Sequence, residues 1–449
     1  MSDSRLPGRT VSTKWRAAVV SALTAVAMPA LALATAAPSA AAGEQATLAS
    51  PADLASQANV AKAAAVGVAP GIAILDLDSR RSFLGAGNGE ALAPVMSADG
   101  NHAIWQYNNY HGAFGLVWRD LSTGQTIVQQ GLWPYGTDVS GNGTYVVYAS
   151  AAATAPSGLI TGMDVWLWDT QTGQRTLIIG TAAGKVGDDG LVRGLHISSD
   201  GDYVVFASTS PFLAPDGYKM CVSSCNNASG YVYLYGRLTR SLRAVPKQAA
   251  FGATPSLGYP VISGNGGIVA FHVGPDVDVW STVTNKVWPV AFQKNVGLTD
   301  GNSLALSANG TVIANSGPGG IGVVQLGPAA GRYHQEWAYY DKGEAAEFQS
   351  AALSSDGSVL AFFGAQGQAG WGHWPLWRVE LPKGSMQLLR PPPVASGLQL
   401  LPAVSGIGDE QVTVSANGAQ IAALACSLKL ASAQAKGCPL RADVYRWTQ

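Results

Sequence analysis

The stretch ISSDGDYVVFAS, residues Ile197 to Ser208, decides the fold of this chain. An apolar residue leads into Ser-x-Asp-Gly, and a run of β-branched and aromatic residues follows the Gly. Asp-Gly and Asn-Gly are strong signals for a tight turn between two strands, because Asn and Asp tolerate left-handed backbone and Gly takes positive φ without a clash. The stretch therefore predicts a strand, a tight turn and a second strand.

The same phrase, with Asp or Asn in third place and Gly in fourth, recurs along the chain, always after an apolar residue. The spacing between successive serines runs from 43 residues (Ser97 to Ser140) to 65 residues (Ser198 to Ser263). The seven serines are Ser97, Ser140, Ser198, Ser263, Ser307, Ser354 and Ser415.

A second signature follows most copies and reads as a strand, a turn with Gly, and another strand. It is seen at residues 116–125, 165–178 and 376–385. Each unit therefore carries four strands and two tight turns. A period of roughly 40–50 residues with four strands per unit predicts an all-β fold, a β-propeller of four-stranded antiparallel blades. The wider spacings are loop insertions.

These repeats resemble the WD40-like repeats of the TolB-type propeller family, which includes many secreted proteins built from such repeats alone. The resemblance extends from about Gly71 to the C-terminus. The chain departs from that family at one position. The family usually has Pro between the Ser and the Asp, and this chain has Ala, Gly or Ser there.

The two ends of the repeat region predict a closed ring of seven blades. Residues 71–84 resemble half a blade and precede the first turn, whereas the last blade stops after residues 442–447 without an outermost strand. We expect the N-terminal segment to supply that strand, because closure removes an exposed sheet edge. The alternative is an eighth, partial blade, since residues 71–84 have room for two strands. Residues 71–449 then form one propeller domain.

Residues 1–42 predict a signal peptide. Four basic residues precede an apolar run, Ala17 to Ala34, and Ala40 to Ala42 offer a small-residue cleavage site. The alternative is an uncleaved anchor, although a run of about 18 residues is borderline for spanning a bilayer. Residues 43–70 are an Ala-rich lead-in, either a short helix or flexible. No later stretch is apolar enough to span, so we expect a secreted or envelope protein.

The chain has four cysteines, all beyond the predicted signal peptide and in close pairs. In an oxidising compartment they predict the disulfides Cys221–Cys225 and Cys426–Cys438. Their spacing lacks the usual zinc-ligand pattern, so we predict no metal and no cofactor. A net charge of −1 with 12% charged residues argues against a nucleic-acid partner, which needs a basic stripe.

Antiparallel strands place both kinds of tight turn on one face of the ring. The connections between the second and third strands of each blade then lie on the opposite face, at residues 149–163, 208–230, 364–375 and 426–441. Aromatic rings beside amides suit a sugar or a peptide; the alternative is that they pack between blades. The candidate binding residues near this face are Tyr107, Tyr110, His111, Tyr218, Trp371, His373 and Trp374.

Two polar residues, Asp138 and His196, lie on the innermost strand, two places before the recurring Ser. The equivalent residues in the other blades are Val95, Val261, Ala305, Ala352 and Thr413. Because blades two and three are neighbours, Asp138 and His196 can pair, either in a functional site or as a structural hydrogen-bonded pair. His272 is predicted near the same face, where a lone His is more often structural.

The sequence contains no Gly-x-Ser-x-Gly, His-Glu-x-x-His or phosphate-binding loop. It therefore favours a secreted, monomeric, non-catalytic propeller that binds an extracellular or envelope protein or a glycan. The alternative is an enzyme acting on polysaccharide, of lyase type, with Asp138, His196 and His272 as base or ligands at the channel mouth. This alternative rests on analogy with other propellers.

Overall fold

The computed structural model describes strands and tight turns, and no helix occurs in the part of the chain that it describes. In that part, no segment has the helical length and hydropathy needed to cross a membrane. The predicted signal peptide and lead-in, residues 1–70, lie outside it. The described residues are 71–74, 90–108, 114–132, 134–154, 160–180, 192–210, 213, 231–246, 257–273, 276–292, 303–317, 320–327, 333–339, 348–364, 376–382, 384, 386–389, 398–399, 412–427 and 442–448.

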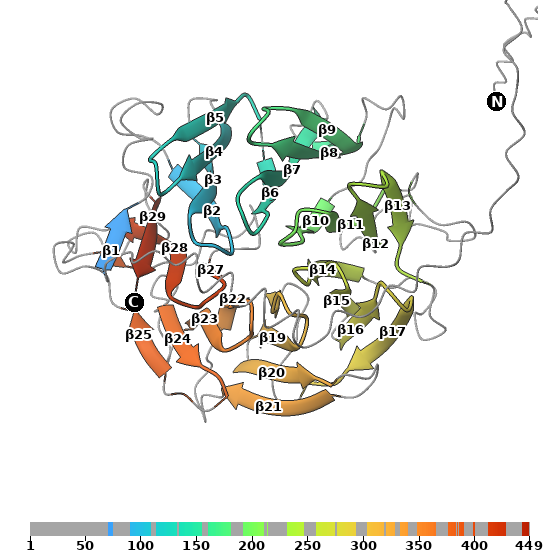
Figure 1. The fold of residues 1–449 in the computed structure, drawn as a ribbon, viewed down its shortest axis with the longest axis vertical. Helices are drawn as coiled ribbons and strands as arrows, with labels where there is room; N and C mark the ends of the chain where they lie inside the picture. Colours follow the sequence, from blue (N-terminus) through green and yellow to red (C-terminus); the bar gives the residue numbers. More distant parts are fainter. Residues whose placement is uncertain are drawn as a thin grey trace, which may run out of the picture. The chain divides into compact units, whose positions relative to one another are not determined.

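These residues form seven antiparallel sheets, the blades, arranged around a common centre (Figure 1). Blades 1 to 6 each have four strands, which follow one another in sequence from the centre outward. Blade 1 contains β2 (Glu90–Met96), β3 (His102–Asn108), β4 (Phe114–Asp120) and β5 (Thr126–Gln130); blade 2 contains β6 (Pro134–Val139), β7 (Tyr145–Thr154), β8 (Ile160–Asp169) and β9 (Arg175–Ile179).

The next four blades repeat this order. Blade 3 contains β10 (Val192–Ile197), β11 (Tyr203–Ser208), β12 (Tyr231–Gly236) and β13 (Ser241–Ala244); blade 4 contains β14 (Leu257–Ile262), β15 (Ile268–Val273), β16 (Asp276–Ser281) and β17 (Lys286–Val290). Blade 5 contains β18 (Leu304–Leu306), β19 (Val312–Gly317), β20 (Gly320–Leu326) and β21 (Tyr333–Tyr339); blade 6 contains β22 (Phe348–Leu353), β23 (Val359–Gly364), β24 (Leu376–Glu380) and β25 (Met386–Leu389).

Blade 7 joins the two ends of the domain. Its inner strands β26 (Leu398–Gln399) and β27 (Val412–Val414) both pair with β28 (Gln420–Ser427), which pairs with β29 (Ala442–Thr448). The outermost strand is β1 (Gly71–Ile74), which runs antiparallel to β29 from Gly71 opposite Thr448 to Ile74 opposite Tyr445. The prediction of seven blades closed by an N-terminal strand is confirmed, and the described residues form no eighth sheet. Residues 75–84 lie outside the description.

The core lies between the blades, because each sheet buries both of its faces against its neighbours. One cluster joins Trp118 of blade 1 to Val146 and Trp168 of blade 2, and another joins Phe206 and Tyr233 of blade 3 to neighbouring blades. This explains why the second strands read as continuous apolar runs rather than alternating ones. Full burial of one such side chain contributes about 2–3 kcal/mol.

The structure corrects the prediction of one loop. Residues 149–163 were expected to connect the second and third strands of blade 2, but β7 continues to Thr154 and β8 begins at Ile160, with these two residues paired. The run of Ala and Ser has low strand propensity, so its pattern indicated a loop. Cross-strand pairing with β8 overrides that propensity. The predicted loops at 208–230 and 364–375 agree with the strand ends at Ser208, Tyr231, Gly364 and Leu376.

Candidate functional site: the central channel

The recurring Ser closes each tight turn through the same hydrogen bonds. In blade 3, Ser198 Oγ accepts the backbone N–H of Tyr203 at 2.9 Å and donates to Asp200 Oδ1 at 2.5 Å. Asp200 Oδ1 also accepts the N–H of Asp202 at 2.9 Å, and Gly201 has φ of 75°. An acceptor oxygen in third place is thus required, which Asp and Asn both supply.

All copies of the turn share this arrangement. The N–H five residues after the Ser bonds to its Oγ at 2.9 to 3.0 Å throughout. Burial raises the pKa of Asp356, but N–H and O–H donors from Ser358 and Ser354 outweigh it and leave that pKa below its ordinary value. The Ser and Asp side chains of the turns are therefore committed to the scaffold.

Neighbouring turns are joined to one another by backbone hydrogen bonds, which we call the turn girdle. The bonds run around the ring and return to their start, where Ala416 N donates to Ala98 O at 2.6 Å. The others are Asp99 N to Gly141 O, Gly141 N to Ser199 O, Asp200 N to Gly264 O, Gly264 N to Ala308 O, Asn309 N to Ser355 O and Ser355 N to Ala416 O.

The girdle explains why the second position of the turn is small, and why Pro is excluded from it in four of the seven copies. A Cβ on Gly141 would lie 3.0 Å from the Ser199 Cβ, and one on Gly264 would lie 3.0 Å from the Ala308 Cβ. The N–H groups of Gly141, Gly264 and Ser355 each donate to the next turn, and Pro has no N–H to donate. At the positions whose N–H donates to the next turn, contacts between blades therefore account for the absence of Pro.

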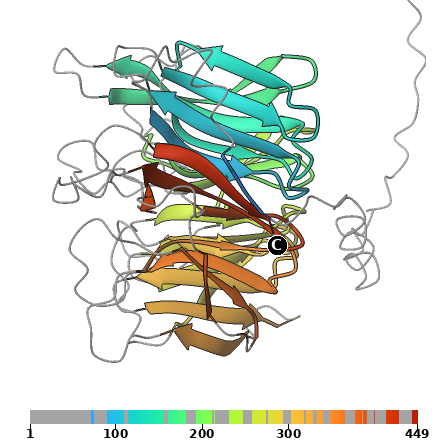
Figure 2. The ribbon, with the colours of Figure 1, turned by 90° about the vertical axis from the view of Figure 1, so that its left-hand side faces the viewer.

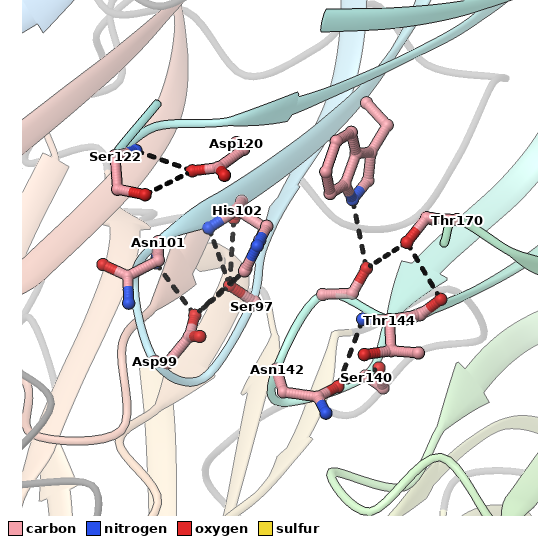
Figure 3. Close-up of polar contacts among 12 residues, drawn as sticks. Ser97, Asp99, Asn101, His102, Asp120, Ser122, Ser140, Asn142, Thr144 and Thr170 are labelled. Carbon is pink, nitrogen blue, oxygen red and sulfur yellow. Dashed lines mark hydrogen bonds and ion pairs between the residues drawn. The ribbon is translucent and has the colours of Figure 1, made fainter. Parts of the chain in front are cut away.

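Ser97, Asp99 and His102 lie together in blade 1 and have the residue types of a catalytic triad (Figure 3). Their geometry is different. Ser97 Oγ donates directly to Asp99 at 2.5 Å, and His102 Nδ1 lies 3.5 Å from both Ser97 Oγ and Asp99 Oδ1. A triad needs the imidazole between the two, with a different nitrogen on each. The adjacent turn makes the same bonds through Ser140 and Asn142 without any His, so this cluster is structural.

A cavity of about 160 Å³ occupies the centre of the ring. Its lining contains one turn residue from each of blades 1 to 6 and the two residues that precede each recurring Ser. In blades 5 to 7 a third residue also lines it: Leu304, Ala351 and Val412. All seven positions that the sequence placed on the channel-side strand line it: Val95, Asp138, His196, Val261, Ala305, Ala352 and Thr413. Asp138 and His196 are the two ionisable side chains among these lining residues, and the surface that the cavity presents is more polar than apolar.

Asp138 and His196 meet across the junction of blades 2 and 3. His196 Nδ1 lies 3.3 Å from Asp138 Oδ2, and the same oxygen accepts the N–H of Ile197 at 2.9 Å. Both side chains are largely buried, with 14% and 13% exposed. The pairing expected from the sequence is therefore present.

Thr413 occupies the position of Asp138 in blade 7 and makes an equivalent bond. Its Oγ1 accepts the N–H of Met96 in the next blade at 3.1 Å, as Asp138 accepts that of Ile197. A neutral hydroxyl thus joins two blades at one junction, and a carboxylate does so at another. Sequence analysis did not predict these hydrogen bonds between blades.

His272 does not belong to this pair. It lies on β15 with 7% of its surface exposed, packs edge-on to Tyr259 with ring centroids 6.3 Å apart, and is not among the lining residues of the cavity. Within the described part of the chain, no group of three His, Cys, Asp or Glu residues is placed to hold a metal ion.

The predicted binding residues divide into one that is described and six that are not. Tyr107 lies within β3, is 3% exposed, and packs its ring against Gly115, where a Cβ would lie 2.6 Å from it. Its burial favours the packing alternative. Cys426 lies in β28, with nothing described of its side chain. Outside the described residues lie Tyr110, His111, Tyr218, Trp371, His373, Trp374, Cys221, Cys225 and Cys438.

The end of the channel opposite the girdle carries a feature that sequence analysis missed. The inner strands β10 and β14 are both bulged there, and Gly194 and Tyr259 have φ of 56° and 48°. The exposed Arg193 lies over the Tyr259 ring at 6.0 Å. A Cβ on Gly194 would lie 2.6 Å from Tyr259 Cα, so only Gly fits. In the sequence, Gly194 and Pro260 were the residues that could have indicated these bulges.

No family model and no curated protein matches this chain. Its solved structural neighbours include propeller domains. The propeller domain of the trilobed protease from Pyrococcus furiosus is 10% identical over 81% of this chain and 94% of that one, with a TM-score of 0.50. The propeller domain of Cps50 (Swd1) from Myceliophteria thermophila is 12% identical over 81% and 97%, with a TM-score of 0.49. At these identities the likeness shows the fold alone.

The Pyrococcus furiosus domain is described as having an open velcro topology. In the present chain β1 pairs with β29, so the ring is completed by a strand from the other end of the domain (Figures 1 and 2).

Proposed function

We propose that this protein is a secreted, monomeric, non-catalytic propeller that recognises a protein or a glycan at the end of the ring opposite the turn girdle. The observation that supports this most is the difference between the two ends. At the girdle, Ser, Asp and Asn side chains are committed to scaffold bonds. At the other end, Arg193 is exposed against Tyr259, and the loops predicted to carry Trp371 and Trp374 follow strands that end there.

Binding is tested with the mature chain, beginning at Gly43, on an array of glycans and extended peptides. We expect Arg193→Ala, and separately the double variant Trp371→Ala/Trp374→Ala, to weaken the strongest hit about tenfold or more, equivalent to about 1.4 kcal/mol. The matched control is Gln171→Ala on the turn face, which should leave affinity unchanged. Equal losses in all three variants, or none in the first two, would place the ligand elsewhere.

Secretion is part of the same proposal and rests on residues 1–42 and the two Cys pairs. Expression of the full chain in a bacterial host that exports proteins should yield a product in the periplasm or medium whose first residue is Gly43. Thiol titration of that product under denaturing conditions should find no free thiol. A chain that keeps residues 1–42 and stays with the membrane would favour the anchor alternative.

A second candidate function is catalysis on polysaccharide, and the contact between Asp138 and His196 favours it. A carboxylate that accepts the hydrogen on Nδ1 holds the imidazole with Nε2 as an acceptor, as a general base requires. Acidic polysaccharides incubated with the protein, with and without a chelator, should then give new chain ends that His196→Ala abolishes. If no substrate is cleaved, the binding proposal is retained.

A further inference from the structure

The turns that join the third and fourth strands, which we call the outer turns, are built alike in blades 1 to 4. In each, the first residue donates its N–H to the carbonyl four residues after the recurring Ser, the third residue is Thr, and the fourth has a positive φ. The outer turns are residues 121–124, 170–173, 237–240 and 282–285. They therefore lie on the same face of the ring as the turn girdle, and their side chains can be compared place by place.

The second residue of the outer turn is polar in blades 1 and 2 but apolar in blades 3 and 4, which are neighbours in the ring (Figure 1). Ser122 and Gln171 hold this place in the first pair of blades. In the second pair it is held by Leu238, 71% exposed, and Val283, 56% exposed, which we call the apolar tips. A single exposed apolar residue is ordinary on a protein surface. Two of them at a repeated place, where a polar residue serves the fold equally well, need an explanation of their own.

The outer turns of blades 3 and 4 are internally bonded. Thr239 Oγ1 donates to Gly236 O at 3.3 Å in the first, and Trp280 Nε1 donates to Asn285 Oδ1 at 3.2 Å at the second. The guanidinium of Arg243, on β13 of blade 3, lies over the Trp280 ring at 5.2 Å. The apolar tips are therefore held in water by ordered turns, and their burial against a partner would require little further ordering.

Three exposed cations lie in or next to these two turns, and within the described part of the chain none has an acidic partner. They are Arg240, Arg243 and Lys286. The acids of the adjacent tight turn in blade 3 are already engaged. Asp202 pairs with Arg237, and Asp200 accepts the hydroxyl hydrogen of Ser198. The surface around the apolar tips is therefore positively charged.

The backbone gives no reason for Arg240 in the fourth place of its turn. Its φ is 52°, which is unfavourable for a residue with a Cβ, and blades 1 and 2 have Gly124 and Gly173 there. Blade 4 has Asn285, a residue type that tolerates this conformation. An Arg held in an unfavourable conformation on an exposed turn is better explained by a contact outside the chain.

Shape and composition together indicate the class of partner. Turn tips with side chains more than half exposed are convex, whereas a small ligand binds in a cleft. Apolar side chains that enter the boundary between head groups and acyl chains, with Lys and Arg beside them, suit the surface of an anionic bilayer. Each buried tip would strengthen such binding about tenfold, and each cation about fivefold.

We propose that the outer turns of blades 3 and 4 bind an anionic lipid surface, with Leu238 and Val283 among the head groups and the three cations against lipid phosphates. The attachment is peripheral and reversible, since two apolar tips bury far less area than a spanning segment. It uses the girdle face, so the opposite end of the ring points away from the lipid and stays open for the recognition proposed above. Neither proposal depends on the other.

Sedimentation with lipid vesicles tests this, using the mature chain beginning at Gly43. Vesicles of equal parts phosphatidylglycerol and phosphatidylcholine should bind it with half-saturation at about 0.1–1 mM lipid in about 0.1 M salt. Phosphatidylcholine alone, or the mixed vesicles in about 0.5 M salt, should bind about tenfold more weakly, because the lipid charge is absent or screened. Equal binding to both kinds of vesicle, or binding to neither, would overturn the proposal.

The variants copy residues of other blades, so they should fold. Leu238→Gln/Val283→Gln gives both turns the residue type of Gln171 and should weaken binding about tenfold or more. Arg240→Gly should weaken binding about fivefold without lowering the melting temperature, since Gly suits a positive φ. Leu388→Gln is the control: Leu388 is 38% exposed on β25 of blade 6, and its replacement should leave affinity unchanged.

A soluble acidic protein as the partner would give a different pattern. Poly-glutamate would then displace the protein from the mixed vesicles, and Leu238→Gln/Val283→Gln would bind those vesicles as tightly as the unaltered chain. That result would overturn the assignment to lipid, and so would a loss in Leu388→Gln as large as the loss at the apolar tips.

Discussion

Two neighbouring regions of each blade differ in how strictly they are repeated: the tight turn, and the channel-lining position just before it. In the turn, every copy uses Ser, an acceptor oxygen from Asp or Asn, and Gly, and closes with the same hydrogen bond to Ser Oγ. Two residues before that Ser, at the channel-lining position, the copies carry Val, Asp, His, Val, Ala, Ala and Thr. The first region is repeated because every blade must solve the same problem of geometry.

This difference separates scaffold from candidate site. A residue type found in all copies is explained by the local turn, as Ser97 and Asp99 illustrate, because the neighbouring turn forms the same bond through Ser140 and Asn142. A polar residue found in one copy among apolar equivalents needs its own explanation. Asp138 and His196 meet that condition, and their contact at 3.3 Å lies on the cavity wall.

The largest effect should come from breaking the ring itself. Deletion of residues 71–84 removes β1 and leaves the edge of β29 unpaired, so we expect aggregation, or a monomer that melts about 10 °C lower. Deletion of residues 43–70 is the control and should melt close to the intact chain. Light scattering with thermal melting measures both. A chain lacking β1 that stays monomeric and melts with the intact protein would show that closure is dispensable.

Pro substitutions at two equivalent turn positions can distinguish the contribution of the girdle hydrogen bonds to stability from that of the turn itself. Ser355 N donates to Ala416 O at 3.0 Å, whereas in the neighbouring turn the girdle donor is Asn309 N and not Ala308 N. Because Pro suits the second position of such turns, Ala308→Pro should be tolerated. Ser355→Pro should cost about 1–3 kcal/mol more in unfolding free energy, since it orphans a carbonyl. Urea titration measures the difference, and equal costs would contradict a role for the girdle.

Asp278 lies outside the tight turns, and its pKa is shifted in the opposite direction from that of Asp356 within a turn, so the two should affect stability with opposite pH dependence. Burial, with a further contribution from Asp276, raises the pKa of Asp278 on β16 from 3.8 to about 6. The folded state therefore retains a proton that the unfolded state loses, and stability falls as pH rises between those values. Asp278→Asn should raise the unfolding free energy by about 1–3 kcal/mol at pH 7.5 and by almost nothing at pH 3.5. A gain that does not depend on pH would contradict this assignment.

The smallest effect should come from exchanging one turn acceptor for the other. Asp356 has a lowered pKa, so its charge adds stability above pH 3.8 that is lost as the pH falls through its folded-state value. Asp356→Asn keeps the acceptor oxygen that four other copies supply with Asn, and should cost less than about 1 kcal/mol at pH 7. Ser354→Ala, which removes both bonds, is the comparison and should cost more. A larger loss in the Asn variant would mean that the copies are not equivalent.

The sequence by itself determined the repeated features, because a tight turn between two strands is governed by residues within five positions of each other. Ser, Asp or Asn, and Gly at fixed spacing were enough to predict seven blades and the seven channel-lining positions, and the incomplete blades at the two ends of the repeat region predicted the closing strand. The predicted loop at 149–163 was wrong in extent, because strand pairing between β7 and β8 extends beyond what local propensity indicates.

Only the tertiary structure decided how the blades meet. The bond from Ile197 to Asp138, the bond from Met96 to Thr413, the bulges that set Arg193 over Tyr259 and the burial of Tyr107 all depend on neighbouring sheets or strands. Residues 59 and 317 positions apart form the first two bonds. No periodic pattern encodes such a contact, because it is fixed by the radial packing of whole sheets rather than by the chain near either residue.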